Sequence, residues 1–183
     1  MLSSWKRFSE GTKRILIVLG VFLLLVMLTV AGALTPLSSE DADALNRELE
    51  NMQQDVRDMD VLSSTVAIFK NNFFINAIMF VPIAGSFFGT YVLYNTGLMI
   101  GAQSTVNGIS PLYVLFFLFF FPFTWMEFIA YSIALSQGAW LTWRIIQHKG
   151  KNELKRTLIL IGACAAILLA AALIESIIIL SLV

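Results

Sequence analysis

The chain has 183 residues and no net charge, so its length suggests a single domain, residues 1–183, and its charge favours no class of partner. Hydrophobic residues make up 58% of the sequence and charged residues only 13%, about half the quarter that is usual in soluble domains. So few charged residues cannot cover the surface of such an apolar protein in water. The interior of a membrane is therefore its expected environment. We therefore expect an all-α, polytopic protein of the cytoplasmic membrane, in contact with membrane lipid.

The first predicted span is residues 15–34, which contain no charge and as a helix cover about 30 Å of hydrocarbon. A secretory signal peptide is the alternative, because the Ala-Gly-Ala sequence at 31–33 resembles a cleavage site. We favour a span because the apolar run is longer than the core of a typical signal peptide. Four bases precede the span and predict a cytoplasmic N-terminus: Lys6, Arg7, Lys13 and Arg14.

Residues 35–66 form the long polar stretch of the chain, with eight acids and two bases, and we expect this segment outside the cytoplasm. Within it an apolar stripe at helical spacing predicts an amphipathic helix, with Ser38 or Ser39 as its N-cap. The stripe either packs on the protein's own body, docks a coiled-coil partner or lies on the membrane surface, and its acidic flank disfavours anionic lipid. As a partner surface it would use Leu45, Leu49, Met52, Val56 and Met59.

Residues 71–143 carry a single charge and are long enough for about three crossings. We divide them into one long span at 71–101, interrupted by Pro82, and a helical hairpin at 112–143 that is broken at Pro122. The ten residues 112–121 would reach only half-way across a bilayer, so this short third helix is either re-entrant or part of two tilted crossings.

The basic segment 144–156 is predicted to be cytoplasmic, and 158–183 is the last span. The sequence thus predicts five hydrophobic helices, with the N-terminus in the cytoplasm and the C-terminus outside.

Small residues recur every four positions in two of these spans, a spacing that permits close helix contact in lipid. We expect them to pack helices within the chain, or to form a homodimer seam in a homo-oligomer. They are Gly85, Gly89, Gly97 and Gly101 in the second span, and Gly162, Ala166 and Ala170 in the last.

Glu127 and Glu175 lie inside apolar runs, where an ionised carboxylate is costly and normally faces the protein interior or water. Each is either a functional carboxylate or a hydrogen-bonding group that joins helices. Asn71, Asn72 and Asn95 add polar groups to the second span and are further candidates for an intramembrane polar element. His148 is alone, Cys164 is the single cysteine, and no nucleophile–base set or metal motif is present. We expect no enzyme activity, metal, cofactor or nucleic-acid partner.

Spaced polar and glycine residues of the chain resemble the stage II sporulation protein M family of bacteria and archaea. The resemblance rests on Asn71-Asn72, Gly85, Gly89, Asn95, Gly97, Gly101, the run from Pro122 to Glu127, and Gly138. It implies a membrane protein commonly described as five helices, whose named member acts in a complex with peptidoglycan-remodelling partners. Phe123 and Thr124 stand where the family pattern has His and Gly, so a role that requires an imidazole there is not implied for this chain.

Two functions follow from these observations. The first is an oligomeric membrane scaffold that recruits an extracytoplasmic protein partner through the amphipathic helix. The alternative is a permease or channel for a small solute, an ion or protons that uses Glu127.

Overall fold

The computed structural model describes residues 8–181, which fold into seven α-helices and one short 3₁₀-helix, with no strand among them. The elements in chain order are α2 (Glu10–Ala33), α3 (Ser39–Arg57), α4 (Val61–Met79), α5 (Ala84–Asn107), α6 (Pro111–Leu118), α7 (Pro122–Ile146), η1 (Gly150–Glu153) and α8 (Leu154–Ser181). The all-α fold class is confirmed. Lys6, Arg7 and the last two residues of the predicted span 158–183 lie outside the described residues.

Polar side chains cap the first turns of three helices. Ser9 caps α2 and Ser38 caps α3, each through a hydroxyl that accepts a hydrogen bond from an amide three residues on, at 3.1 Å. Asp60 caps α4 and accepts from the amides of Leu62 and Ser63 at 2.9 and 3.1 Å. Hydrogen bonds from the Ser63 side chain and backbone lower the pKa of Asp60. These contacts satisfy amides that the helices themselves leave unpaired.

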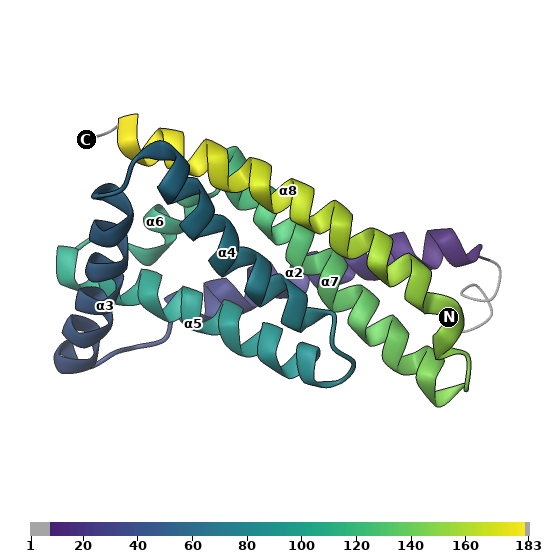
Figure 1. Ribbon diagram of the computed structural model, residues 1–183. Coiled ribbons are helices and arrows are strands. Elements are labelled where there is room, and N and C mark those ends of the chain that lie inside the picture. The colour runs from purple at the N-terminus through teal and green to yellow at the C-terminus, as the bar shows by residue number, and fades with distance from the viewer. Residues whose placement is uncertain (1–7, 182–183) are drawn as a thin grey trace.

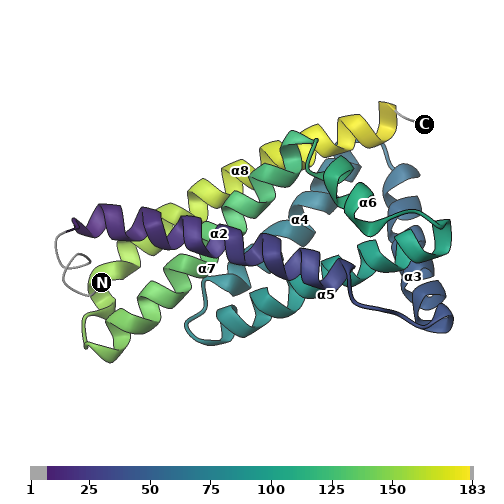
Figure 2. The same ribbon diagram turned by 180° about the vertical axis from the view of Figure 1, so that it is seen from behind.

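Five long helices, α2, α4, α5, α7 and α8, form the body of the protein (Figures 1 and 2). α2 packs against α5 and α7, and α8 packs against α4 and α7. Each long helix contributes a buried side chain to the central core: Leu25, Met79, Leu93, Leu135 and Leu168. The α7–α8 turn lies at one end of the body, and α3 and α6 lie at the other (Figure 1).

Residues 71–101 do not form the single long span that the sequence predicts. The chain breaks at residues 80–83, and α4 and α5 run back along one another as the two arms of a V (Figures 1 and 2). Ile83 has a φ of 63°, a conformation that β-branched residues rarely adopt. Pro82 and this backbone turn therefore reverse the chain, whereas the sequence predicted only an interruption.

Contacts with α7 fix this reversal. The amide of Ile83 donates to the Thr142 hydroxyl at 3.1 Å, and that hydroxyl donates to the Gly138 carbonyl at 2.9 Å. A Cβ on Gly138 would lie 2.6 Å from the Met79 carbonyl oxygen, so only glycine lets the end of α4 approach α7 this closely.

Glycines also bring α2 and α5 into backbone contact. Gly32 and Gly97 face each other, and a Cβ on either would collide with backbone atoms of the opposite helix. One turn later, a Cβ on Gly101 would lie 2.8 Å from the Ala33 carbonyl oxygen. Gly85 is buried against backbone carbonyls at the end of α4, and Gly89 against the side chains of Leu135 and Met79. All four small residues of the predicted second span thus lie at close contacts within the chain.

The small residues of α8 behave differently. Gly162, Ala166 and Ala170 are exposed, and a Cβ on Gly162 would meet no atom within 4 Å. The packing contact that the sequence predicts inside the chain is therefore absent for these three residues. α8 instead turns Cys164 and Leu168 inward, on the other side of the helix.

Within the described residues, two helical stretches are long and apolar enough to cross a membrane: α2 and the continuous stretch Gly150–Ser181. α6 and α7 together satisfy the same criterion but are bent by 88°, and would make a third span if counted as one. These are fewer than the five hydrophobic helices that the sequence predicts. A hydropathy average treats Asn72 and Asn76 of α4 as though they faced lipid, whereas the fold buries both.

The α2–α5 contact predicts a difference between two glycine substitutions. Gly97→Ala should lower the thermal unfolding midpoint in detergent, because its Cβ meets the Thr29 carbonyl and overpacking costs about 1–3 kcal/mol. Gly162→Ala is the matched control and should be neutral or stabilising, since alanine favours helix by up to ~1 kcal/mol over glycine. Equal midpoints for the two variants would contradict the assigned contact.

Candidate functional site

Much of the predicted partner stripe on α3 faces the rest of the chain. α3 packs on α5, and Ala42 and Asn46 are fully buried on the face between them. Leu45, Leu49 and Val56 are half-buried. The stripe therefore holds α3 in a fixed position on the body of the protein.

The rest of α3 remains available to a partner. Met52 is 44% exposed, and Met59, two residues beyond the end of α3, is 36% exposed, so these two residues of the predicted stripe are not packed on the body of the protein. The physical reason is geometric, because α3 stands crosswise to α5 and can contact it over only part of its length (Figure 1). The exposed face carries six acids, Glu40, Asp41, Asp43, Glu48, Glu50 and Asp55, against two exposed bases, Arg47 and Arg57.

A polar pair joins α4 to α7 in the interior. The side-chain amide of Asn72 donates to Glu127 Oε1 at 2.5 Å, and Asn71 donates to Asn72 Oδ1 at 3.2 Å. The structure thus brings together three of the predicted polar residues, Asn71, Asn72 and Glu127, while Glu175 forms no hydrogen bond or ion pair among the described residues. Asn95 is apart from them and donates to the Tyr91 carbonyl of its own helix at 2.8 Å.

Further polar groups on α4 lie at helical spacing from Asn72. Asn76 is fully buried, and neither its side-chain oxygen nor its nitrogen has a hydrogen-bond partner. The Ser64 hydroxyl is also buried and unpartnered. Beside them the Ser176 hydroxyl of α8 donates to the Val61 carbonyl at 3.0 Å. Because buried polar groups are normally satisfied, Asn76 and Ser64 stand out as the groups on this side of α4 whose hydrogen-bonding capacity is unused.

The bend between α6 and α7 exposes backbone carbonyls that lipid cannot satisfy. Pro122 is the first residue of α7 and lacks an amide hydrogen, so the helix starts there without an unpaired donor at that position. The Thr124 hydroxyl donates to the Leu118 carbonyl at 2.9 Å, and Trp125 Nε1 donates to the Phe119 carbonyl at 2.7 Å. Trp125 therefore stabilises the bend, a role that the sequence does not reveal.

A second polar cluster joins α2, α7 and η1 near the α7–α8 turn. Arg14 is 8% exposed; one of its terminal nitrogens donates to both Glu153 carboxylate oxygens at 2.8 Å, and the other to Gln137 Oε1 at 3.0 Å. Arg144 pairs with the same carboxylate at 3.3 Å. Both guanidinium groups lie over the Trp140 ring, at 4.3 and 5.5 Å from its centroid.

Burial sets the energetic weight of these ion pairs. Removing one partner of a buried pair such as Arg14–Glu153 typically costs about 3–5 kcal/mol, because a charge is left uncompensated. Arg144 also pairs with Glu10, whose side chain is 65% exposed, and such a pair contributes roughly 0–1 kcal/mol. The sequence shows only that Glu153 is an acid within a basic segment; its partner Arg14 lies 139 positions away.

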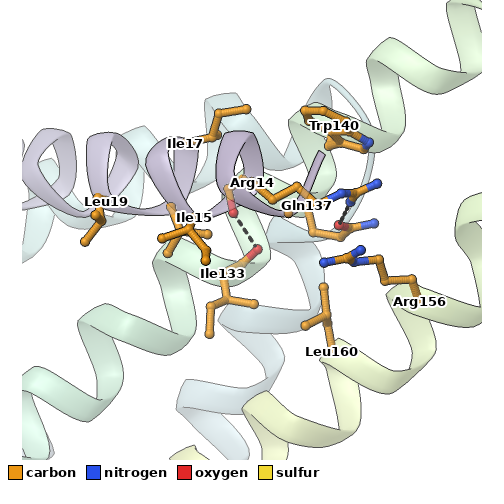
Figure 3. Close-up of a pocket in the computed structure, with 12 residues that line it drawn as sticks. Arg14, Ile15, Ile17, Leu19, Ile133, Gln137, Trp140, Arg156 and Leu160 are labelled. Carbon is orange, nitrogen blue, oxygen red and sulfur yellow. Dashed lines mark hydrogen bonds between the residues drawn. The ribbon is translucent and has the colours of Figure 1, made fainter. Parts of the chain in front are cut away.

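Two cavities lie along α2. One, of about 360 Å³, lies beside Arg14 and Gln137, where α2, α7 and α8 meet (Figure 3). The other, of about 500 Å³, has an apolar lining that includes Phe22, Phe116 and Trp125, between α2, α6 and α7. Glu127 lines neither of these two cavities.

Apolar helices able to span a bilayer, joined by buried polar pairs and glycine contacts, define an all-α membrane protein. The sequence matches the family described as Stage II sporulation protein M over residues 16–178, nearly the whole chain. The protein belongs to this family. No match was found among curated proteins or among solved structures.

The residues on which the family resemblance rests have structural positions in this chain. Gly138 lets the end of α4 pack closely on α7, and Gly97 lets α2 pack closely on α5. Asn72 and Glu127 form the interior polar pair. Thr124, at the position where the resemblance led us to expect a glycine, hydrogen-bonds across the α6–α7 bend. The matched pattern therefore describes how helices are joined in this chain.

Proposed function

We propose that this protein is a multi-pass membrane scaffold that presents α3 to a protein partner outside the cytoplasm. The observation that carries the proposal is the position of α3, which is fixed on α5 by buried residues while its acidic face and Met52, and Met59 just after the helix, remain exposed. A rigidly mounted helix loses little conformational freedom on binding, which favours affinity.

The distribution of charge supports a topology in which the α7–α8 turn is cytoplasmic. Lys149, Lys151, Lys155 and Arg156 surround that turn, and Lys13 begins the apolar part of α2 at the same end. The acidic segment 35–66 lies at the opposite end. By the positive-inside rule the N-terminus is then cytoplasmic and the C-terminus outside.

Five crossings reconcile this topology with the order of the helices. α2 leaves the cytoplasm, α4 returns, α5 leaves, α7 returns and α8 leaves, so α4, with its buried Asn72 and Asn76, and α5 would both cross the membrane. α6 has eight residues and a rise of about 12 Å, too short to cross, and we assign it as re-entrant.

Cysteine labelling tests this topology. In a Cys164→Ser background, Ser39→Cys should react with an impermeant maleimide applied to intact cells, because Ser39 is exposed at the α3 end. Asn152→Cys, exposed in η1, should react only after the membrane is permeabilised. Reaction of both cysteines in intact cells, or of neither, would contradict the proposed orientation.

The exposed face of α3 indicates the chemistry of the partner. Six acids and two bases give this face a negative potential, which favours a partner with a basic surface and speeds its association. Met52 and Met59 are flexible apolar side chains of the kind common at adaptable binding surfaces. We therefore propose a protein partner with a basic patch around an apolar contact.

A second proposed contact is between copies of the chain. Gly162, Ala166 and Ala170 lie on the exposed face of α8, where small residues permit close helix approach. We propose this face as the seam of a homo-oligomer.

Site-specific cross-linking tests the scaffold function. A photo-reactive side chain placed at Met52, on the intact protein in its native membrane, should yield one discrete adduct with another protein. The same group at Ala42, which is buried, should yield only internal products and serves as the matched control. Adding Glu48→Lys and Glu50→Lys should reduce the Met52 adduct through loss of charge complementarity. Lipid adducts alone at Met52 would contradict the proposal.

A permease or channel remains the second candidate, favoured by the unpartnered amide of Asn76 beside the Glu127 pair. We rank it below the scaffold because Glu127 already accepts a hydrogen bond from Asn72, and because neither described cavity is lined by Glu127.

A further inference from the structure

The cavity beside Arg14 has one polar and one apolar end (Figure 3). Its volume of about 360 Å³ is within the usual range for small-molecule sites. Arg14, Gln137 and Arg156 line the polar end, and Figure 3 shows the Arg156 guanidinium pointing toward Gln137. Leu19 and Ile133 belong to the apolar lining. The cavity thus suits an amphiphile.

The charges around the cavity leave one cation unmatched. Arg14 and Arg144 are neutralised by Glu153 and Glu10, through the ion pairs described above. Arg156 is exposed and forms no ion pair or hydrogen bond among the described residues, and its guanidinium points toward Gln137 at the polar end of the cavity. An anionic headgroup at this end of the cavity would therefore meet a guanidinium that no carboxylate of the described residues neutralises.

The apolar lining continues onto a surface that faces lipid. Ile15 and Leu19 line the cavity and are 63% and 55% exposed on α2, the first candidate span. Leu160 of α8 lines the cavity opposite them. A hydrocarbon chain could therefore run from the cavity along α2 without leaving apolar surroundings. A free inorganic anion would have no use for this apolar path, so the path favours a lipid as the ligand.

We propose that this cavity binds an anionic phospholipid of the adjacent leaflet, with its phosphate at Arg156 and one acyl chain along the Ile15–Leu19 wall. Basic pockets between membrane helices are suited to such headgroups. The lipid would join α2 to α8 at the end of the body where Arg14 already joins α2 to α7 and η1. This proposal is independent of a role for α3.

Lipid binding to the full-length protein tests the proposal. Detergent-purified protein would be titrated with phosphatidylglycerol, and bound lipid counted by native mass spectrometry. Arg156→Gln should weaken one phosphatidylglycerol site about fivefold, the equivalent of roughly 1 kcal/mol for one basic residue. Lys155→Gln is the matched control, because Lys155 is exposed, carries the same charge and does not line the cavity. Lipid-free thermal midpoints of both variants should equal that of the wild type.

Each other outcome would overturn the proposal. Equal losses of phosphatidylglycerol binding in the two variants would show that the lipid responds to diffuse surface charge and not to this cavity. Equal binding of phosphatidylcholine would show an apolar groove without headgroup selection. Competition by inorganic phosphate at concentrations near those of the lipid would show an anion site that does not require an acyl chain.

Discussion

Helices in a bilayer gain little by exchanging lipid for one another, so their contacts must come from close backbone approach and from buried polar pairs. This constraint accounts for the contacts that hold the helices of this structure together. Gly32 and Gly97 let α2 and α5 touch through their backbones. Asn72 and Glu127 join α4 to α7, and the buried Arg14–Glu153 pair joins α2 to η1. An ordinary apolar residue at any of these positions would remove a contact that lipid cannot replace.

The same contacts explain how a surface helix is held in place. α3 packs on α5, and α5 is held against α2 by glycine contacts, so the exposed face of α3 has a fixed orientation relative to the bundle. At the other end, Arg14 holds α2 to α7 and η1 through Gln137 and Glu153. A bundle fixed at both ends is suited to present a surface, which is the basis of the proposed scaffold function.

Local patterns in the sequence identify several parts of this arrangement. The glycine spacing at Gly97 and Gly101 predicts close contact, and the charge of Glu127 within an apolar run predicts an interior partner. The reversal between α4 and α5 is not predictable in this way. It depends on Ile83 and Thr142, residues 59 positions apart, and nothing in the local sequence distinguishes a reversal from a kink at Pro82. The exposure of Gly162 likewise depends on which side of α8 the fold turns inward.

In this structure Glu127 joins α4 to α7 through Asn72. The most direct test of that role compares Glu127→Gln with Glu127→Leu, in thermal unfolding and in proton or solute flux into reconstituted vesicles. We expect the Gln variant to match the wild type in both, because an amide can still accept the Asn72 hydrogen bond. The Leu variant should unfold at lower temperature, since a buried amide left unpaired costs about 1–3 kcal/mol. A stable Gln variant that loses a flux present in the wild type would contradict that role and identify Glu127 as a transport carboxylate.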